Sequence, residues 1–394
     1  MPTVATVSLK QGRAKPLWYG HPWVYSEAIA TADAFEPGDE VRVVDHDGRL
    51  IGRGFANPRS QLAVRMCTWR DEPLDESFIA GRLAQARELR ARQGLPSEAT
   101  TAYRLVNSEG DDLPGLIVDV FGDAVVVMFT TFAMKKREEV VFDALENIIS
   151  PRPRTIFEAA AGGVAEIEGF RAQARVARGE SRPSARCREN GIELDIEPLA
   201  GQKTGWFLDQ RQNRAQIGRL CADARVLDLY SYAGGFALAA ARGGARSVVA
   251  VDVSARALER TRAHFALNDL PAPEIIESDV FRYLEKAPAG AFDVVVCDPP
   301  KFARARKDLD AALRGYRRLN ALALAACSDD AILGTASCSQ LVDEMSFERM
   351  LAAAAKDAHR RLQVVSIASQ GPDHVVPLGF AEGRYLKFFV CRVR

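Results

Sequence analysis

The chain has 394 residues, 47% hydrophobic and 26% charged, which is enough for two or three domains with sizeable cores. Its 52 basic and 52 acidic residues give a formal net charge of zero, which excludes an overall positive field and leaves any nucleic-acid surface to local clustering. The seven cysteines and five histidines show no metal-ligand spacing, and no apolar run approaches the ~18 residues that cross a membrane. We therefore expect a cytoplasmic protein with reduced thiols, no metal and no membrane partner.

Residues 1–70 are predicted to form a small β-barrel-like domain. Short β-type runs separated by Gly, Pro and Asp lie at residues 6–9, 40–44, 50–55 and 62–68. Asp47-Gly48, between the second and third runs, is a strong hairpin signal. Trp23 and Tyr25 are either core residues, which is the favoured interpretation, or a platform on which bases stack.

Residues 71–195 are predicted to form a connector helix followed by a small α+β domain. The helix covers residues 74–93 and places Ile79, Leu83, Ala86 and Leu89 on one face. The pattern then predicts a hairpin, a helix and two strands at residues 115–121, 124–129, 133–148, 155–158 and 192–196. Residues 179–188 are rich in Arg, Ser and Pro, which is typical of a flexible loop or linker.

Residues 196–394 alternate between β runs and helical runs, which predicts a parallel sheet with helices on both faces. The strands are expected at residues 225–229, 247–251, 274–277, 292–297, 331–335 and 362–367, and the helices at 235–242, 255–268, 309–326 and 343–359. The last run, residues 384–392, has no helix before it and is predicted to insert antiparallel. The fold class is therefore α/β, with a mostly parallel, doubly wound sheet after the two smaller domains.

Three acids close successive strands of this predicted sheet. Asp228, Asp252 and Asp279 lie where ligands bind in doubly wound sheets, although each alone could also be a helix N-cap. The glycines of residues 230–236 do not spell the dinucleotide pattern, which favours a nucleoside cofactor without pyrophosphate, namely S-adenosylmethionine. Asp252 would then accept hydrogen bonds from ribose hydroxyls and Asp279 would bind the adenine amino group. Val253 and Val280 are expected to contact the adenine ring.

Two further strand ends carry candidate catalytic residues. The corner Asp298-Pro299-Pro300 leaves the sheet as a rigid, extended segment because the prolines fix φ, and Asp298 can meet a planar base that bears an amino group. Cys338 follows the neighbouring strand. Taken alone it is more often an inert, buried filler than a nucleophile, because burial in apolar surroundings disfavours the thiolate.

Six motifs together resemble the bacterial ribosomal RNA large subunit methyltransferase I family. The resemblance covers nearly the whole chain and implies an N-terminal PUA domain at residues 1–70, a central α+β domain at 71–195 and a Rossmann-like S-adenosylmethionine-dependent methyltransferase domain at 196–394. The motifs are His21-Pro22-Trp23-Val24-Tyr25-Ser26, Asp112-Leu113-Pro114-Gly115-Leu116, Gln202-Lys203-Thr204-Gly205-Trp206-Phe207-Leu208-Asp209-Gln210-Arg211, Tyr230 to Phe236, Asp298 to Phe302 and Ser337-Cys338-Ser339.

The resemblance implies methylation of cytosine C5 in 23S ribosomal RNA, with Cys338 as the nucleophile. A thiolate that adds to C6 makes C5 nucleophilic, so covalent catalysis divides one difficult step into two easier ones. The catalytic residues it predicts are Cys338, Asp298 and Lys301. The cofactor-binding residues it predicts are Phe207, Asp209, Arg211, Asp228, Tyr230, Ser231, Tyr232, Gly234, Phe236, Asp252, Val253, Asp279, Val280, Asp298 and Pro299.

The sequence departs from the family pattern at two positions near the catalytic residues. Gln340 stands where relatives usually have Gly, and Cys297 stands where they often have an apolar residue. The second cysteine that many RNA cytosine methyltransferases carry in the Asp-Pro-Pro corner is absent from the sequence. The group that removes the C5 proton is therefore unassigned, with Cys297 a disfavoured candidate.

The RNA partner is expected to bind a basic segment beside the Asp-Pro-Pro corner. Residues 301–318 hold seven Lys or Arg against two Asp, although such a run is often only a solvated helix face. The predicted phosphate-binding residues are Arg304, Arg306, Lys307, Arg314, Arg317 and Arg318. A base in folded RNA would have to leave its stack to reach Cys338.

Two alternatives to cytosine-C5 methylation stay open. The same fold could methylate a ring or exocyclic nitrogen of an RNA base, because Asp-Pro-Pro is similar to the Asn-Pro-Pro corner of amino methyltransferases. The chain could also be a catalytically inactive RNA-binding protein, which would not bind S-adenosylmethionine. The oligomeric state is open, with a homodimer as one option.

Overall fold

The computed structural model describes residues 4–201, 203–303 and 305–394, which form two compact units. The first unit comprises the chain up to Gly191 together with Asp195–Leu208 and Pro372–Gly383. The second comprises Ile192–Leu194, Asp209–Gly371 and Arg384–Arg394. None of the helices in these described ranges combines the length and apolar character that crossing a bilayer requires.

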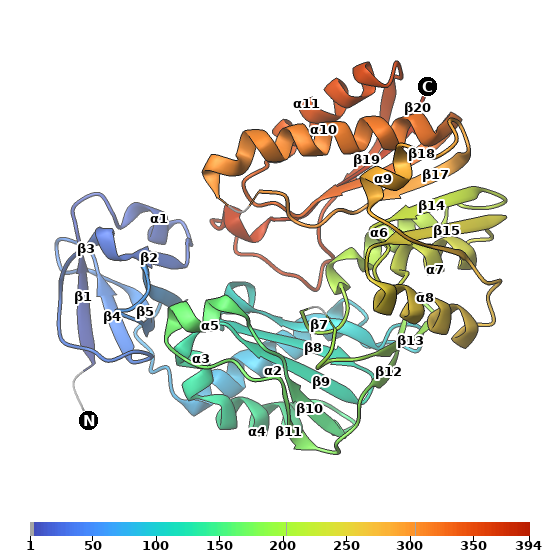
Figure 1. The fold of residues 1–394 in the computed structure, drawn as a ribbon. Coiled ribbons are helices and arrows are strands. Elements are labelled where there is room, and N and C mark those ends of the chain that lie inside the picture. The colour runs from blue at the N-terminus through green and yellow to red at the C-terminus, as the bar shows by residue number, and fades with distance from the viewer. Residues whose placement is uncertain (1–3, 202, 304) are drawn as a thin grey trace. The chain divides into compact units, whose positions relative to one another are not determined.

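The N-terminal part of the first unit is a six-stranded sheet with the order β2-β6-β5-β4-β1-β3 (Figure 1). The predicted hairpin is present, with Gly48 at φ +79° in its turn. Trp23 packs against Phe380 with 4.6 Å between ring centroids, while Tyr25 is 41% exposed. The elements are β1 (Ala5–Leu9), α1 (Lys15–Trp18), β2 (Trp23–Tyr25), β3 (Ile29–Ala32), β4 (Glu40–Val44), β5 (Leu50–Ala56) and β6 (Leu62–Thr68).

A five-stranded sheet with the order β11-β10-β9-β8-β7 follows in the first unit. Its core is built from apolar side chains of these strands, α2 and α4. The elements are α2 (Glu76–Arg92), β7 (Ala102–Asn107), β8 (Leu116–Phe121), β9 (Ala124–Phe129), α3 (Phe132–Lys136), α4 (Glu138–Ile148), β10 (Thr155–Glu158), α5 (Gly163–Glu168) and β11 (Arg175–Gly179). The next two strands, β12 (Ala185–Glu189) and β13 (Ile192–Ile196), form a separate two-stranded sheet.

Two expectations for this region are wrong. Leu89 of α2 is 38% exposed, and the buried residue beside it is Arg90, whose charge is compensated by an ion pair with the buried Asp111. The loop predicted at residues 179–188 is much shorter, because β11 ends at Gly179 and β12 already begins at Ala185. The arginine-rich strand resembled a loop because its side chains alternate between buried and more exposed positions, which hides the apolar pattern.

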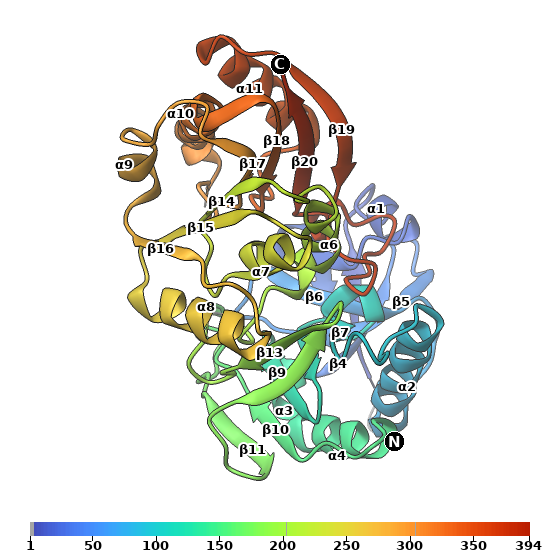
Figure 2. The same cartoon turned by 90° about the vertical axis from the view of Figure 1, so that its right-hand side faces the viewer.

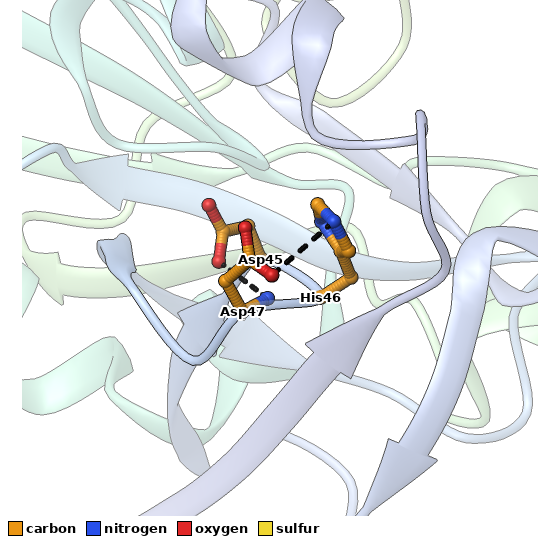
Figure 3. A group of neighbouring side chains, drawn as sticks. All are labelled: Asp45, His46 and Asp47. Atoms are coloured by element: carbon orange, nitrogen blue, oxygen red, sulfur yellow. Dashed lines mark hydrogen bonds and ion pairs between the residues drawn. The ribbon is translucent and has the colours of Figure 1, made fainter.

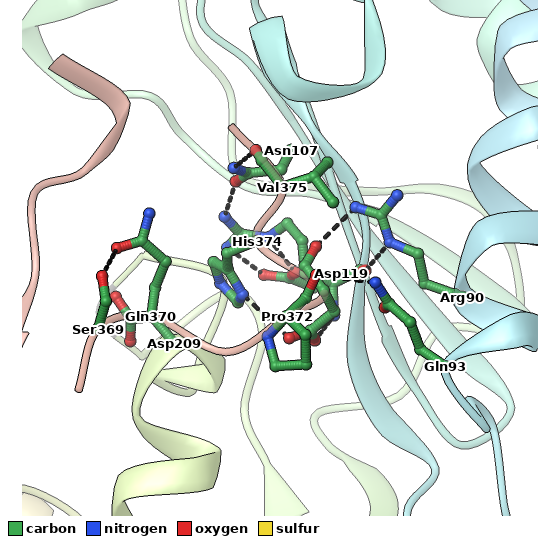
Figure 4. A network of polar contacts seen from close by, with 12 residues as sticks. Arg90, Gln93, Asn107, Asp119, Asp209, Ser369, Gln370, Pro372, His374 and Val375 are labelled. Atoms are coloured by element: carbon green, nitrogen blue, oxygen red, sulfur yellow. Dashed lines mark hydrogen bonds and ion pairs between the residues drawn. The ribbon is translucent and has the colours of Figure 1, made fainter. Parts of the chain in front are cut away.

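Residues 372–383 come late in the chain but pack within the first unit (Figure 4). The guanidinium of Arg90 donates to the carbonyl oxygen of Asp373 at 2.6 Å, and the side-chain amide of Asn107 donates to that of Val375 at 2.9 Å. Gln93 likewise donates to the carbonyl of Pro372 at 2.9 Å. Residues 372–383 contain no strand, so side chains from α2, from Gln93 directly after it and from β7 bind the carbonyl groups of this segment.

The second unit is built on a seven-stranded sheet with the order β16-β15-β14-β17-β18-β20-β19. All neighbouring strands are parallel except that β20 runs antiparallel to both β18 and β19, as predicted for the last run. The strands are β14 (Arg225–Leu229), β15 (Ser247–Asp252), β16 (Glu274–Glu277), β17 (Phe292–Cys297), β18 (Cys327–Ser337), β19 (Leu362–Ala368) and β20 (Lys387–Val393).

Helices cover both faces of this sheet (Figures 1 and 2). α9, α10 and α11 pack on one face around Tyr316 and Phe347, and α6, α7 and α8 lie on the other. The central strands are apolar almost throughout, because a parallel sheet covered on both faces has no polar side. The helices are α6 (Arg211–Gly218), α7 (Gly235–Arg242), α8 (Ala255–Leu267), α9 (Val280–Leu284), α10 (Leu309–Ala326) and α11 (Glu344–Asp357).

Candidate active site

The turn between β14 and α7 has an uncommon backbone conformation. Tyr230 and Tyr232 have φ values of +59° and +49°, a region that bulky residues rarely adopt and that often marks functional sites. Gly234 has φ +83°, and a Cβ there would lie 2.5 Å from Cγ2 of Thr261. The hydroxyl of Thr261 donates to the carbonyl oxygen of Tyr232 at 3.2 Å. α8 therefore holds the turn in one shape at the carboxyl edge of the sheet.

Asp228 is a buried acid with an open acceptor in this turn. Its Oδ2 accepts the backbone N–H of Ala237 at 2.9 Å, whereas its Oδ1 has no hydrogen-bond partner among the described residues. The hydroxyl of the buried Ser231 also has none. Burial, with smaller contributions from the nearby carboxylates of Asp298 and Asp252, raises the pKa of Asp228 to about 8. Such a group favours a ligand that donates a hydrogen bond and carries positive charge.

Asp252 organises the same edge from the end of β15. Its two carboxylate oxygens accept the backbone N–H groups of Tyr232 and Ser254, each at 2.9 Å. Each oxygen has a second lone pair and the residue is only partly buried, so ribose hydroxyls can still bind there. Asp279 is different, because it is exposed and caps α9 by accepting the N–H of Arg282 at 3.0 Å. The N-cap alternative is thus present at Asp279.

The apolar residues predicted to bind the cofactor have unequal exposure. Val253, next to Asp252, is 65% exposed. Val280, at the start of α9, is buried in the same hydrophobic core as the apolar face of α10. Phe236 stacks on Phe388 with 5.6 Å between ring centroids and is almost fully buried. Tyr230 is partly buried against the core. Contact of these four side chains with a cofactor remains a prediction.

Residues 209–214 add buried charge to the second unit. Asp209 accepts the phenolic hydroxyl of Tyr385 at 2.6 Å, and Arg211 and Arg214 are almost fully buried. The positive charge of Arg214 opposes the rise in the pKa of Asp228. Phe207 belongs to the first unit, where the amine of Lys203 lies 4.6 Å from its ring centroid.

Adjacent strand ends bring Asp298 and Cys338 to the same edge of the sheet. Cys297 is paired with Thr335, so the Asp-Pro-Pro corner and the Ser-Cys-Ser segment leave β17 and β18 side by side. The N–H of Ala303 donates to Oγ of Ser339 at 3.4 Å, which ties the corner to the segment. Asp298 and Cys338 are both partly exposed, while Pro299 is buried.

The two serines hold the cysteine between them. The hydroxyl of Tyr316 lies 3.1 Å from Oγ of Ser337 and 3.2 Å from Oγ of Ser339, and the Tyr316 ring stacks on Phe302 at 4.6 Å. Cys338 is the cysteine that stays partly exposed, whereas the other six are buried. Burial raises the pKa of the Cys297 thiol strongly, which disfavours it as an acid or base.

The predicted RNA-binding residues differ in how they are held. Arg317 is paired with Asp357 at 2.6 Å and Arg318 with Glu285 at 2.5 Å. Arg306, Lys307 and Arg314 are exposed, as is Lys301. Arg304 lies outside the described residues. The basic segment therefore combines arginines already engaged by carboxylates with exposed cations.

A cluster of potential metal ligands occupies the β4–β5 turn (Figure 3). Ligand atoms of Asp45, His46 and Asp47 lie within 4.8 Å of one another. Oδ1 of Asp45 accepts the backbone N–H groups of Asp47 and Arg49 at 3.0 and 2.9 Å. These bonds are those of an ordinary Asx-type turn, which accounts for the cluster.

Sequence reasoning missed three residues that shape this edge of the sheet: Arg214, Tyr316 and Lys387. Lys387 had a usable signal, because it is a single charge at the start of the apolar run Phe388-Phe389-Val390. Tyr316 had none, since an aromatic residue on the apolar face of a helix normally indicates only core. Arg214 lies in a polar stretch that gave no apolar periodicity.

Comparisons with known proteins agree with this architecture. Residues 7–69 match the family of PUA-like domains, and residues 166–356 match the family of S-adenosylmethionine-dependent methyltransferases. The structure is similar to an S-adenosylmethionine-dependent methyltransferase from Streptococcus mutans, with TM-score 0.84, 21% identity and coverage of 99% of this chain and 100% of that chain. A methyltransferase complexed with S-adenosylhomocysteine gives TM-score 0.86 at 22% identity, with the same coverage. These likenesses confirm the predicted fold class.

The fold and the site define an S-adenosylmethionine-dependent methyltransferase with a PUA-like domain. The chain is 37% identical to ribosomal RNA large subunit methyltransferase I of Photobacterium profundum, over 99% of each chain. It is 38% identical to the protein of that name from Shewanella denitrificans, over 98% of this chain and 99% of the other. The chain therefore belongs to the ribosomal RNA large subunit methyltransferase I family, as the sequence motifs predicted.

The residues at the sheet edge fit the cofactor of this family. S-adenosylmethionine carries an ammonium, a sulfonium and ribose hydroxyls, and the edge offers the buried acid Asp228 with two carboxylates, Asp252 and Asp298, that interact with it. The open Oδ1 of Asp228 and the open hydroxyl of Ser231 are polar atoms that a ligand of this kind would satisfy.

Proposed function

We propose that the protein methylates C5 of a cytosine in large-subunit (23S) ribosomal RNA through a covalent bond between Sγ of Cys338 and C6 of the base. Relatives over the full length carry the name ribosomal RNA large subunit methyltransferase I, which supports the substrate class. The observation that carries the mechanism is the position of Cys338. It is the partly exposed cysteine, held by two serines at the strand end next to Asp298.

The cofactor would be held by Asp228, Ser231 and Asp252, and it supplies an electrophilic methyl group when bound. Asp228 and Ser231 would bind its amino-acid end, because their open polar atoms suit an ammonium and a carboxylate. Asp252 would accept the ribose hydroxyls while keeping its two bonds to the turn. Lys301, exposed after the corner, would contact the RNA next to the target base.

The reaction at the base uses the chain's own groups. The thiolate of Cys338 forms a bond to C6, and the electron pair moves to C5, which then attacks the methyl group. Asp298 would hydrogen-bond the N3 and N4 edge of cytosine and stabilise the charge that develops on addition. Loss of the C5 proton to a base restores the double bond and expels the thiolate. Cys297 is a poor candidate for that base, because it is fully buried and burial raises its thiol pKa.

A covalent trap tests this proposal. RNA with 5-fluorocytosine at the target should form an adduct with the protein that survives denaturing electrophoresis, because fluorine cannot leave C5 as a proton. Cys338→Ala should form none and should transfer no methyl group, yet it should bind S-adenosylmethionine with unchanged affinity. Cys391→Ala is the matched control, since Cys391 is a buried cysteine on β20, and it should still form the adduct.

Other outcomes would identify the alternatives. Methyl transfer without an adduct in any variant would indicate methylation of a base nitrogen, and methyl transfer by Cys338→Ala would exclude the covalent mechanism. Absence of S-adenosylmethionine binding in calorimetry would indicate an inactive RNA-binding protein. Mass spectrometry of ribosomal RNA from a deletion strain would locate the methylated nucleotide.

A further inference from the structure

Lys387 is a buried cation at the Ser-Cys-Ser segment. It begins β20, is 5% exposed and is paired in register with Ser337. Its amine donates to the carbonyl oxygen of Ser339 at 2.7 Å and to that of Tyr385 at 2.8 Å. The amine is therefore fixed one residue from Cys338. A lysine is rarely buried without a partner that justifies the cost of desolvating it.

The charged and titratable groups around this amine come from several elements. They are Cys338 after β18, Asp343 at the start of α11 and Lys301 after β17. Tyr316 on α10 faces Cys338, and burial and Cys338 raise its pKa. Burial, with a smaller contribution from Lys301, lowers the pKa of Lys387 to about 8 despite the opposing negative charges of Cys338 and Asp343. Asp343 is exposed and already caps α11, so it compensates the buried amine only in part.

We propose that Lys387 is a positioning residue whose ammonium group holds the thiolate of Cys338 as an ion pair. The S–H bond breaks and its proton passes to solvent, and the ammonium charge of Lys387 balances the thiolate that remains. The two carbonyl acceptors take two of the three ammonium protons, which leaves the third for the thiolate.

This proposal rests on the proposed role of Cys338 as the nucleophile, and it adds the group that activates it. An ordinary thiol has a pKa of about 8.5, so little thiolate is present at neutral pH without help. The charge on Lys387 must be present for the effect, so it operates below the pH at which the amine loses its proton. Cys338 is then reactive in the neutral range without being buried.

Alkylation of the full chain measures the thiolate directly. Peptide mass spectrometry would follow the rate at which iodoacetamide modifies Cys338 between pH 5.5 and 9.5. In the wild type this rate should increase with pH, and its midpoint should lie at a low pH. In Lys387→Met the midpoint should lie higher by about one pH unit, with roughly tenfold slower alkylation at pH 6.5. Lys387→Arg should restore the low midpoint, because it keeps the positive charge. Lys356→Gln removes an exposed cation of α11 and should match the wild type.

The same profile in Lys387→Met and the wild type would overturn the proposal. Should Lys387→Met fail to fold, Lys387→Gln keeps a donor for Ser339 and gives the same comparison. The assay uses no RNA, so it separates the two claims. A shifted alkylation profile in Lys387→Met, together with methyl transfer by Cys338→Ala, would support the ion pair and overturn the proposed function. An unshifted profile together with an intact 5-fluorocytosine adduct would support the proposed function and overturn the ion pair.

Discussion

Asp228 is a buried acid at a strand end, and we expect its titration to couple cofactor binding to pH. Its carboxyl is fully buried, and its folded-state pKa of about 8 lies far above the ~3.9 of a free aspartate. The folded protein without cofactor thus keeps a proton that the unfolded chain has already released between these values. This contribution lowers stability as pH rises through that window. A cationic ligand reverses the preference, because it favours the ionised acid.

The affinity for S-adenosylmethionine should therefore increase with pH between about 6 and 7.5. Ionising Asp228 below its pKa costs binding energy, so the affinity should change by up to about tenfold per pH unit. Calorimetry at several pH values should show this slope in the wild type, with proton release on binding. Asp228→Asn should bind weakly and without the slope.

Asp223→Asn is the control for this measurement. Asp223 is an exposed acid paired with Arg246 at 2.6 Å, and its removal should leave the pH slope unchanged. A wild-type affinity that is independent of pH in this window would show that Asp228 does not meet the positive charge of the cofactor.

The turn from β14 to α7 is an element whose shape depends on one glycine. Gly234→Ala combines a positive φ with a Cβ 2.5 Å from Thr261, so we expect a loss of about 1–3 kcal/mol in the free energy of unfolding. Urea denaturation would measure it. Gly244→Ala is the matched control, since Gly244 has a similar φ of +87° but its nearest contact is an ordinary 3.9 Å. Equal losses at both positions would assign the effect to φ alone and not to packing on α8.

The basic segment around α10 allows a second test at the scale of an element. Arg317 and Arg318 are paired with Asp357 and Glu285, so a phosphate would have to displace those carboxylates. Arg314→Ala should therefore reduce the slope of log affinity for ribosomal RNA against log salt concentration by about one unit, the value for one lost phosphate contact. Arg317→Ala should lower it by less. An unchanged slope in both variants would assign this helix to the solvated surface.

Elements were predictable from sequence where an apolar pattern alone determined them. β14 and β17 have the predicted bounds, because strands covered on both faces carry apolar runs. The edge strand β16 also has the predicted bounds, although its two glutamates are exposed. α6 was missed, since its buried face carries Arg211, Asn213 and Arg214 in place of apolar residues. The strand ends predicted the edge where Asp228, Asp298 and Cys338 lie. The hydrogen bonds of Ser337 and Ser339 with Tyr316, and that of the Lys387 amine with the Ser339 carbonyl, could not be predicted, because each joins residues far apart in sequence.

The two units are not continuous in sequence, and the sequence pattern does not predict this. The chain leaves the second unit after Gly371, packs residues 372–383 within the first unit and returns at Arg384. The backbone carbonyls of residues 372–383 accept hydrogen bonds from Arg90, Gln93 and Asn107, which lie more than 260 positions earlier in the chain. The predicted boundaries at residues 70 and 195 follow changes in composition, whereas this insertion follows from long-range hydrogen bonds.

Arg90 should therefore stabilise more than its own helix. Its side chain is fully buried, forms a two-pronged ion pair with Asp111 and donates to the carbonyl oxygen of Asp373 at 2.6 Å. Arg90→Met leaves the buried carboxylate of Asp111 without its partner, so the first unit should lose about 3–5 kcal/mol in the free energy of unfolding. Residues 372–383 should also become sensitive to limited proteolysis.

Arg92→Met is the control, because it removes an exposed arginine two residues along α2. It should change stability by less than about 0.5 kcal/mol and leave the cleavage pattern as in the wild type. A stable Arg90→Met variant with a protected segment would show that Arg90 is not needed to hold residues 372–383 in place.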